Sequence, residues 1–362
     1  MKGFATILVV LVLALASTTG YLGYRVATEP TSEEIVGELT WDEIATMKAL
    51  LPISSFSVDD VAGEIGGVPF TDDLDREVTI DEAVERIVCL NPAATETIFD
   101  LGVDIMLVAV SDSWSGNASA PDPVESWIET PEDIDNEIEA RVSAGELTAL
   151  DAFSVGAEAI LDLEPDVVFT FGYTLPAYAE AIQDIVPVIC FAPTTLEDVL
   201  QNIVLIGKVV DKEVEAQDMV EEIKADIADI ASMTIDIARP KVFCEIDSWG
   251  GFRTTGAESF VSSLIILAGG EDIGTVVSTD NPIISDETIV DSQPEIIILL
   301  DAPWENAVTV AGRSGWSTIP AVTSGNIYEA STKDKDLIQR SGPRIAEGLK
   351  ILLGIIHPEL SE

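Results

Sequence analysis

The amino-acid sequence predicts an α/β protein of two Rossmann-like lobes, each a mostly parallel sheet with flanking helices, joined by one long rigid helix. A ligand cleft is expected between the lobes. Short, continuously apolar runs alternate with helical segments, which is typical of parallel strands buried on both faces. A helical block separates two such regions, and residues 288–300 in the second repeat a pattern of residues 159–171 in the first. Both copies have a helix end, Asp, a polar residue, Pro, an acid and an apolar strand, which indicates two similar lobes.

The first lobe is predicted over residues 68–193. It opens with VPFTDDLDREVTI, residues 68–80, in which two short strands flank an Asp-rich turn. A helix is expected after the first main strand and ends at Gly102. The stretch 111–150 is polar, acidic and too long for an ordinary loop, so it is either functional or an insertion. The main strands are expected at residues 86–90, 105–110, 166–170 and 186–191.

A helical linker is predicted over residues 194–239. Thr194 and Glu197 have the spacing of a capping box, and apolar side chains recur at helical spacing from Val214 to Ile230. A helix from about residue 211 to 237 would contain about 27 residues and be about 40 Å long. The second lobe, residues 240–362, is expected to repeat the alternation of strands and helices and to end with a helix from Pro343 to Ile356.

The N-terminal residues 1–26 are predicted to be a signal peptide or a membrane anchor. A lysine precedes an uncharged apolar run, and Ala14 and Ala16 form a cleavage-type site. Extended to Val26, the apolar stretch has about 20 residues, which is enough to span a bilayer. Both interpretations place the rest of the chain outside the cytoplasm, and the second tethers it to the membrane. Residues 27–67 are predicted to be an acidic spacer of unassigned role.

The chain is strongly acidic, with 65 acidic and 18 basic residues and a formal net charge of −47. Such a surface repels nucleic acid, which binds basic faces. The acids are spread along the whole chain, which indicates a halophilic protein whose internal repulsion is screened by salt.

Cysteine and histidine usage excludes several kinds of site. Cys89, Cys190 and Cys244 lie in apolar runs without a CxxC pair, so we expect buried thiols and neither a disulfide framework nor a zinc site. The chain has one histidine, His357, so a His-based metal cluster and a Ser–His or Cys–His pair are not expected. We predict that the protein is not an enzyme and has no cofactor, although its ligand can carry iron or cobalt.

Six segments follow one another along the chain: VPFTDDLDREVTI (68–80), RIVCLNPAATETIFDLG (86–102), GAEAILDLEPDVVFT (156–170), TTGAESFVSSLIILAGGEDI (254–273), GWSTIPAVTSGNIYEA (315–330) and RSGPRIAEGLKILLGIIHPE (340–359). In this order they resemble the helical-backbone class of ABC substrate-binding proteins, those for siderophores, haem and cobalamin. The resemblance covers about residues 68–360. This sequence departs from the family in its long 111–150 stretch and in lacking a cysteine for a lipid anchor.

The resemblance implies an extracytoplasmic binding protein of an ABC importer, a monomer whose partners are the membrane permease and its ATPase. It also implies one docking glutamate on each lobe, for arginines of the permease. By motif position these are Glu158 and Glu258. Each lies near the start of a predicted helix, where the helix dipole favours a carboxylate, and each can form a charge-assisted hydrogen bond with an arginine.

Ligand contacts are expected in loops that leave the C-terminal ends of the strands. Aromatic side chains suit a large organic ligand, and an arginine can pair with an anionic group of a chelate. The candidates are Trp114, Phe171, Tyr173, Trp249, Phe252, Arg253 and Trp304, with Arg313 as a weaker one.

Two ligand classes fit these candidates. An anionic iron chelate of the siderophore type would use Arg253 and few aromatic side chains, whereas a corrinoid such as cobalamin would use many aromatic side chains and no strong charge. The iron chelate is the preferred interpretation, with a corrinoid or haem as the alternative. A bare zinc or manganese ion is disfavoured because such sites need histidine. A cleft enzyme such as a metal chelatase, or a surface adhesin, are the remaining alternatives.

Overall fold

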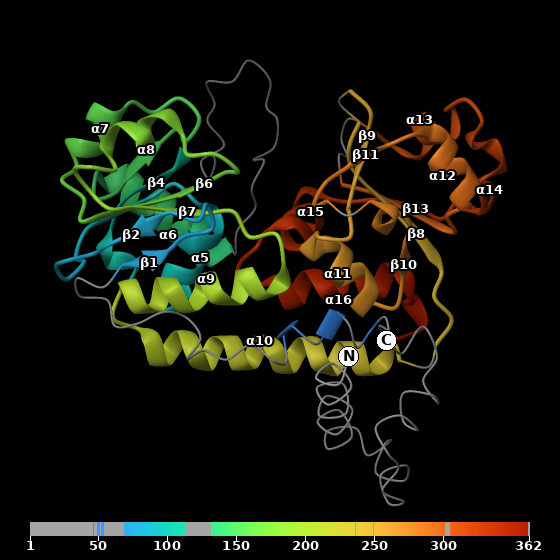
Figure 1. The fold of residues 1–362 in the computed structure, drawn as a ribbon, viewed down its shortest axis with the longest axis horizontal. Coiled ribbons are helices and arrows are strands. Elements are labelled where there is room, and N and C mark those ends of the chain that lie inside the picture. The colour runs from blue at the N-terminus through green and yellow to red at the C-terminus, as the bar shows by residue number, and fades with distance from the viewer. Residues whose placement is uncertain are drawn as a thin grey trace, which may run out of the picture. The chain divides into compact units, whose positions relative to one another are not determined.

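The computed structural model forms two compact units (Figure 1). The described residues within 57–222 and 332–345 form the N-terminal unit, and those within 1–56, 223–331 and 346–362 form the C-terminal unit. The predicted signal peptide or anchor, and Trp114, Trp249 and Trp304, lie outside the residues that the structure describes. Among the described helices, none is both long and apolar enough to cross a membrane. The described residues are 46, 49–50, 52–53, 69–112, 132–235, 237–248, 250–277, 279–300 and 305–360.

The predicted hairpin at residues 68–80 is confirmed, and its turn attaches it to a neighbouring sheet. The buried side chain of Asp72 accepts hydrogen bonds from the amides of Arg76, at 3.1 Å, and Cys190, at 3.0 Å. The Arg76 guanidinium pairs with Asp72 and donates to the Val188 carbonyl at 3.0 Å. The acidic turn therefore fixes the hairpin to an edge strand. The two antiparallel strands are β1 (Phe70–Thr71) and β2 (Glu77–Val78).

The sheet of the N-terminal unit is a parallel doubly wound sheet, as expected. Its strand order is β5-β4-β3-β6-β7, and every pairing is parallel. The order reverses between β3 and β6, and ligands of such sheets bind in the crevice at the C-terminal ends of the strands beside this point. The strands are β3 (Ile87–Cys89), β4 (Leu107–Ser111), β5 (Thr148–Leu150), β6 (Val167–Phe171) and β7 (Val188–Phe191).

Helices flank this sheet (Figure 1). The first begins where Asn91 accepts a hydrogen bond from the amide of Ala94 at 3.1 Å, with proline in its first turn. It ends before Gly102, whose φ is 68°. The helices are α5 (Pro92–Asp100), η2 (Asp104–Met106), α6 (Glu132–Ala144), α7 (Ala157–Leu161), α8 (Ala177–Ile182) and α9 (Leu196–Val209).

Part of the 111–150 stretch belongs to the sheet. It contains α6 and then β5, which pairs in parallel with β4 at the edge. Arg141 on α6 donates to the carbonyls of Asp104, at 2.9 Å, and Leu107, at 3.0 Å, and so fixes the helix to the start of β4. The polar composition concealed this helix and strand, because α6 carries acids on much of its surface and β5 has only three residues.

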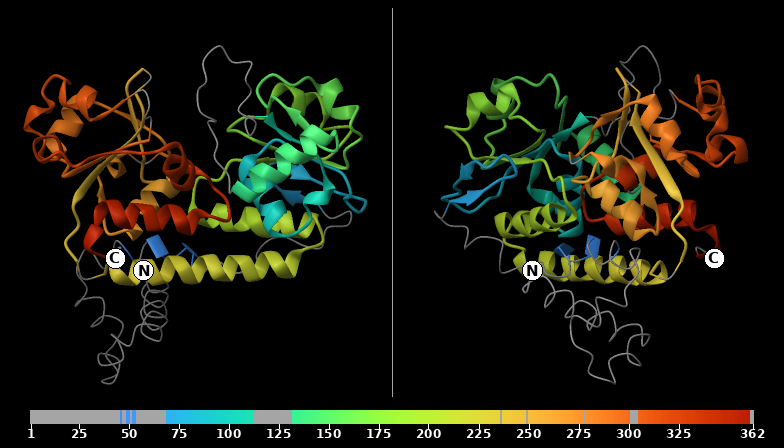
Figure 2. Two further views of the ribbon diagram at one scale, coloured as in Figure 1. Left: turned by 180° about the vertical axis from the view of Figure 1, so that it is seen from behind. Right: turned by 45° about the vertical axis from the view of Figure 1, so that its right-hand side comes forward.

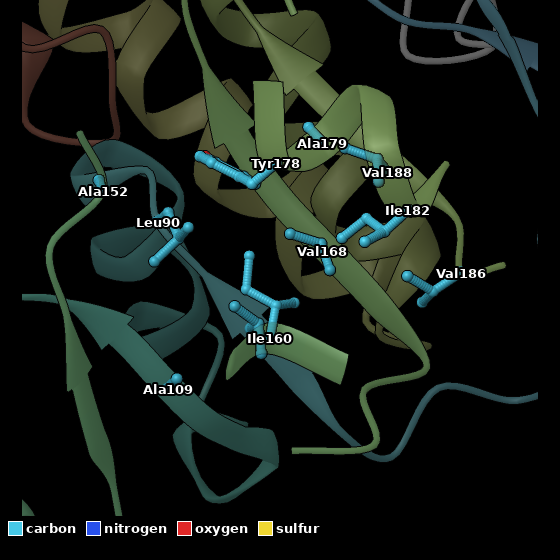
Figure 3. Packing of buried hydrophobic residues seen from close by; sticks show 11 residues of the cluster. Leu90, Ala109, Ala152, Ile160, Val168, Tyr178, Ala179, Ile182, Val186 and Val188 are labelled. Carbon is cyan, nitrogen blue, oxygen red and sulfur yellow. The ribbon is translucent and has the colours of Figure 1, made fainter. Parts of the chain in front are cut away.

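The core of the N-terminal unit lies between the sheet and helices α7 and α8 (Figure 3). Val168 on the interior strand β6 and Ile160 on α7 are fully buried, and Ile182 on α8 packs into the same cluster. Burying each such side chain stabilises the fold by about 1.5–3 kcal/mol.

Helices α9 and α10 (Glu213–Met233) lie side by side (Figure 2). A Cβ on Gly207 would stand 2.3 Å from the Ala216 Cβ and 2.8 Å from the Lys212 carbonyl oxygen, so only glycine permits this approach. The capping box of α9 uses Thr195 and Asp198, one position later than predicted. Helix α10 has 21 residues, about 31 Å, which is shorter than the sequence pattern indicated. Its residues up to 222 belong to the N-terminal unit and the remainder to the C-terminal unit.

The C-terminal unit has a mixed sheet. Its main order is β11-β9-β8-β12-β13, and β10 also pairs with β8. The pairings of β8 with β10 and β12 and of β12 with β13 are parallel, whereas those of β9 with β8 and β11 are antiparallel. The strands are β8 (Lys241–Asp247), β9 (Phe252–Thr254), β10 (Glu271–Asp272), β11 (Ile283–Ile284), β12 (Ile296–Leu299) and β13 (Ile327–Glu329).

Short helices connect these strands, and a longer helix, α16, follows the last strand of the unit (Figure 1). One helix of this region, α15 (Thr332–Gln339), belongs to the N-terminal unit. The others are α11 (Phe260–Leu267), η4 (Ile273–Val276), α12 (Asp286–Ser292), α13 (Ala307–Ala311), η5 (Trp316–Thr318), α14 (Pro320–Ser324), α16 (Ile345–Ile356) and η6 (Pro358–Leu360).

The internal repeat is confirmed, because both copies fold as a short helix followed by a central parallel strand. Helix α7 leads to β6 in one unit and α12 leads to β12 in the other. Glu164, with φ 48°, and Gln293, with φ 52°, occupy the same left-handed position just before a proline. Gln293 is the C-cap of α12, whereas α7 already ends before its C-cap Asp162. In both copies the proline prevents the helix from continuing.

Part of the predicted spacer packs against the C-terminal unit. Thr46, Leu50 and Ile53 are buried. Arg239 donates to the Thr46 hydroxyl and, at 2.8 Å, to the carbonyl of Ile266. These residues are therefore part of the folded unit and do not act as a simple spacer.

The segment that carries α15 is held in the N-terminal unit by a buried ion-pair cluster. Glu96 on α5 is 1% exposed and pairs with Arg340, and Arg344 lies 3.9 Å away. Burial raises the pKa of Glu96, and the two arginines oppose this effect. Removing one partner of such a pair leaves a buried, uncompensated charge, which is strongly destabilising.

Candidate ligand-binding and docking sites

Two predicted aromatic residues lie at the C-terminal end of β6, beside the point where the strand order reverses. Phe171 is half-buried, and Tyr173, two residues further on, is 69% exposed. Phe153, in the loop after β5, is 83% exposed, and the two phenylalanine rings meet edge to face with centroids 5.9 Å apart. The N-terminal unit therefore presents a small aromatic surface where a ligand of this fold is expected.

Phe153 was not among the residues that the sequence singled out. Because Thr148–Leu150 was not recognised as a strand, the loop after it was not identified as a loop at the C-terminal edge of the sheet. The short run Thr-Ala-Leu followed by Asp is the one signal that could have indicated it.

Acidic side chains also lie at the C-terminal ends of the strands in this sheet. Asp112 follows β4 and Asp151 follows β5. Partial burial, and then the neighbouring charge of Asp151, raise the pKa of Asp112. Hydrogen bonds from Ser154 and from the Phe153 amide lower the pKa of Asp151. This local charge disfavours an anionic group at the edge.

A small cavity of about 170 Å³ lies between α6 and strands β4 and β5. Sites for drug-sized ligands occupy about 300–1,000 Å³, so this cavity is too small for a complete chelate or corrinoid. It is lined by Val110, Ser111, Asp135, Ile138, Glu139, Val142, Ser143 and Ala149.

In the C-terminal unit, Phe252 and Arg253 lie in a strand, although the sequence placed them in a loop. Strand β8 extends to Asp247, and a turn at Gly250 and Gly251, with φ values of 78° and 143°, leads into antiparallel β9. The sequence pattern concealed this hairpin because β9 is only three residues long.

Arg253 is already engaged within the C-terminal unit. Its Nε donates to the Asp247 carboxylate at 2.9 Å, and Nη1 donates to the Asn281 carbonyl at 3.2 Å. An anionic ligand would compete with Asp247 for this guanidinium, so Arg253 is a weaker anion receptor than its position in the sequence indicated.

Arg313 packs against the ring of Phe252 and binds carboxylates of its own unit. Its guanidinium lies 4.6 Å from the ring centroids of both Phe252 and Trp316. Nη1 and Nη2 bind the fully buried Glu245 at 2.5 and 2.7 Å, and Nη2 lies 3.0 Å from Glu305. Arg313 therefore holds the Phe252 ring in place, and its charge is compensated by two carboxylates.

The two predicted docking residues are both exposed. Glu158 is the second residue of α7. Glu258 lies in the turn just before Ser259, the N-cap of α11, and is therefore outside the helix itself. Both lie near helix N-termini, where the helix dipole favours a carboxylate.

The thiols and the histidine have structural environments. All three cysteines are buried and free, and burial raises the pKa of Cys89 and Cys190 to about 12. The His357 ring is buried between the Gly269 carbonyl, at 3.1 Å, and Glu359, at 3.2 Å. Within the described ranges, no cluster of three or more His, Cys, Asp or Glu side chains could hold a metal ion.

The sequence and the fold have counterparts among known proteins. The family model for periplasmic binding proteins matches residues 87–333, which is more than half of the chain. The chain therefore belongs to the periplasmic binding protein family. It is a substrate-binding protein of an ABC transporter, in the class whose members serve siderophores, vitamin B12 and haem.

Three similar proteins illustrate this class. The uncharacterized ABC transporter substrate-binding lipoprotein YvrC of Bacillus subtilis is 27% identical over 82% of this chain and 87% of its own. A cobalamin-binding protein of Halobacterium salinarum is 26% identical over 77% of this chain and 71% of its own. The crystal structure of a possible iron-binding, periplasmic solute-binding protein from Staphylococcus epidermidis superposes with a TM-score of 0.62, at 22% identity, over 76% of this chain and all of that one.

Proposed function

We propose that this chain captures a corrinoid outside the cytoplasmic membrane and delivers it to an ABC permease. The main observation in support concerns the surroundings of the aromatic rings. The charged groups near them are either carboxylates or an arginine that already pairs with a carboxylate. Phe153, Phe171 and Tyr173 offer apolar contact beside acidic groups, and Arg253 is paired with Asp247. A large organic ligand without a strong negative charge suits this combination better than an anionic chelate does.

The comparisons add weight to this choice, because the Halobacterium salinarum relative is named a cobalamin-binding protein. An iron chelate of the siderophore type is the second candidate. Arg253 favours it, because a ligand oxyanion could take the place of the Asp247 carboxylate.

Delivery is proposed to use Glu158 and Glu258, each pairing with an arginine of the permease, while the ATPase drives release. The binding protein itself performs no chemistry in this scheme. The N-terminal segment is proposed to tether the chain to the outer face of the membrane, and the long α10 helix to limit the change in shape on ligand binding to a small closure.

Tryptophan fluorescence of the full chain, in detergent and high salt, tests the ligand. The probes are cyanocobalamin, haemin and a ferric hydroxamate siderophore. Saturable quenching by cyanocobalamin at micromolar concentrations or below is expected, and Phe171→Ala and Tyr173→Ala should each weaken it by about 10- to 30-fold.

Ile185→Ala is the matched control. Ile185 is an apolar side chain of the same unit and is 69% exposed. Because it precedes β7, it lies at the N-terminal ends of the strands, away from the proposed ligand contacts at their C-terminal ends. Tight binding of the ferric siderophore alone, abolished by Arg253→Ala, would instead assign the second candidate.

A further inference from the structure

The buried carboxylate of Asp272 accepts hydrogen bonds from two chain segments, one of which leads to Glu258. Asp272, at the end of β10, is 3% exposed. Its Oδ2 accepts a hydrogen bond from the Thr255 hydroxyl at 2.7 Å, and its Oδ1 accepts one from the Gly274 amide at 2.9 Å. Thr255 is itself fully buried and lies three residues before Glu258.

The backbone of this loop is bonded to the segment that follows η4. The Thr254 amide donates to the Pro282 carbonyl at 2.9 Å, and the Gly256 amide donates to the Asp280 carbonyl at 2.7 Å. The Ala257 amide donates to the Val277 carbonyl at 2.9 Å. The Glu258 amide also donates to the Thr279 carbonyl, at 3.4 Å. The paired amides on both sides of Thr255 give the loop one preferred arrangement.

Two glycines allow the segments to approach this closely. A Cβ on Gly256 would lie 1.8 Å from the Thr279 carbonyl oxygen, and a Cβ on Gly274 would lie 1.8 Å from the Thr255 carbonyl oxygen. No side chain fits at either position. The loop is therefore a packed part of the unit, and Glu258 is exposed at its outer end.

We propose that Asp272 is a positioning residue for docking: it fixes residues 254–258 so that the Glu258 carboxylate meets a cationic side chain of the permease in one geometry. A loop that is already ordered loses less conformational freedom when it binds. The inference rests on the docking role proposed for Glu258.

The ligand contacts should be insensitive to Asp272. Phe252 is held by its strand pairing to Ile284 and by Arg313, and Arg253 is held by Asp247. Loss of the Asp272 hydrogen bonds is therefore expected to separate docking from ligand binding.

Asp272→Ala removes both hydrogen bonds, whereas Asp272→Asn has nearly the same shape and can still accept from the Gly274 amide and donate to the Thr255 hydroxyl. Thr255→Val removes only the hydroxyl and serves if the alanine variant fails to fold. Glu271→Ala, a change at an exposed neighbouring acid, is the matched control.

The first measurement is hydrogen exchange of the full chain. Exchange at the amides of residues 256–258 should rise about tenfold or more in Asp272→Ala and Thr255→Val, and stay near that of the unmodified chain in Asp272→Asn and Glu271→Ala.

The second measurement is ATP hydrolysis by the permease–ATPase complex in nanodiscs as the full chain is titrated. The concentration for half-maximal stimulation should rise about tenfold in Asp272→Ala and in Glu258→Gln, and less than about twofold in Asp272→Asn and Glu271→Ala. Quenching by cyanocobalamin should be equal in all of them.

The outcomes separate the two proposals. Unchanged docking by Asp272→Ala and Thr255→Val, together with impaired docking by Glu258→Gln, overturns the positioning role and leaves the docking role intact. Unchanged docking by Glu258→Gln overturns both.

Discussion

At the scale of single residues, the burial of Asp272 makes the stability of the protein depend on pH. Burial raises the pKa of Asp272 from 3.8 to about 6, and hydrogen bonds from Gly274 and Thr255 offset part of this effect. The native state therefore binds the proton more tightly than the unfolded chain does. The contribution of this group to stability is full at acid pH and is lost as the pH rises from about 4 to about 6.

Asp272→Asn should remove this dependence, because the amide resembles the protonated acid. The melting temperature of the asparagine variant should differ little from that of the unmodified chain near pH 3.5 and exceed it increasingly up to pH 7. The full difference corresponds to about 3 kcal/mol. Thermal unfolding of both chains across this range, in high salt, is the measurement. A difference that does not vary with pH would contradict the account.

The arginines show what the sequence could not reveal at this scale. Arg253 and the weaker candidate Arg313 are singled out by the sequence because an arginine can pair with an anionic group of a ligand, but their partners within the protein depend on the fold. Glu245 and Asp247 lie within a predicted apolar strand or just after it, and only the antiparallel return of β9 brings Asp247 to Arg253. Neither a pairing across a tight hairpin nor the pairing of Glu245 with Arg313, 68 residues further on, leaves a periodic signal in the sequence.

At the scale of elements, the sequence predicted the parts with strong local patterns. The hairpin at residues 68–80, the buried parallel strands and the repeated helix–strand unit all depend on neighbouring residues, and all were found. Boundaries were less accurate where alternatives lie side by side. Thr194 and Glu197 offer one capping box and Thr195 and Asp198 another, and the geometry of the helix start selected the second.

Gly207 tests the close packing of α9 on α10. Gly207→Ala would place a methyl group 2.3 Å from the Ala216 Cβ, so the two helices must move apart. Overpacking of this kind costs about 1–3 kcal/mol, despite the better helix propensity of alanine. Gly156→Ala is the control, because nothing lies within 4 Å of its added methyl group; as the N-cap of α7 it loses only the preference of that position for glycine over alanine. Denaturant unfolding should show a clearly larger fall in the midpoint for Gly207→Ala than for Gly156→Ala; equal midpoints would refute the packing argument.

At the scale of the whole molecule, the family of the two α/β units gives the class of protein. The acidic composition concerns the salt concentration at which the chain is expected to be stable. Family membership defines a binding protein of an ABC transporter, while the identity of the ligand depends on side chains at the sheet edges. The predicted tryptophan contacts lie outside the described residues, so the proposed ligand contacts are Phe153, Phe171 and Tyr173 in the N-terminal unit and Phe252 in the C-terminal unit.

Salt should stabilise the full chain, because a net charge of −47 opposes the compact state. Between 0.1 and 2 M KCl, screening of this repulsion should raise the melting temperature by roughly 10 °C or more. The measurement is thermal unfolding by circular dichroism at neutral pH. A melting temperature that is constant or falls with salt would contradict the interpretation of the charge as a halophilic adaptation.

The most direct test of the central claim is calorimetric titration of the full chain with cyanocobalamin in high salt. The account predicts one site per chain with a dissociation constant in the micromolar range or below, weakened by Phe171→Ala and unaffected by Ile185→Ala. No heat beyond dilution with cyanocobalamin, together with saturable binding of a ferric hydroxamate siderophore to the same preparation, would contradict it.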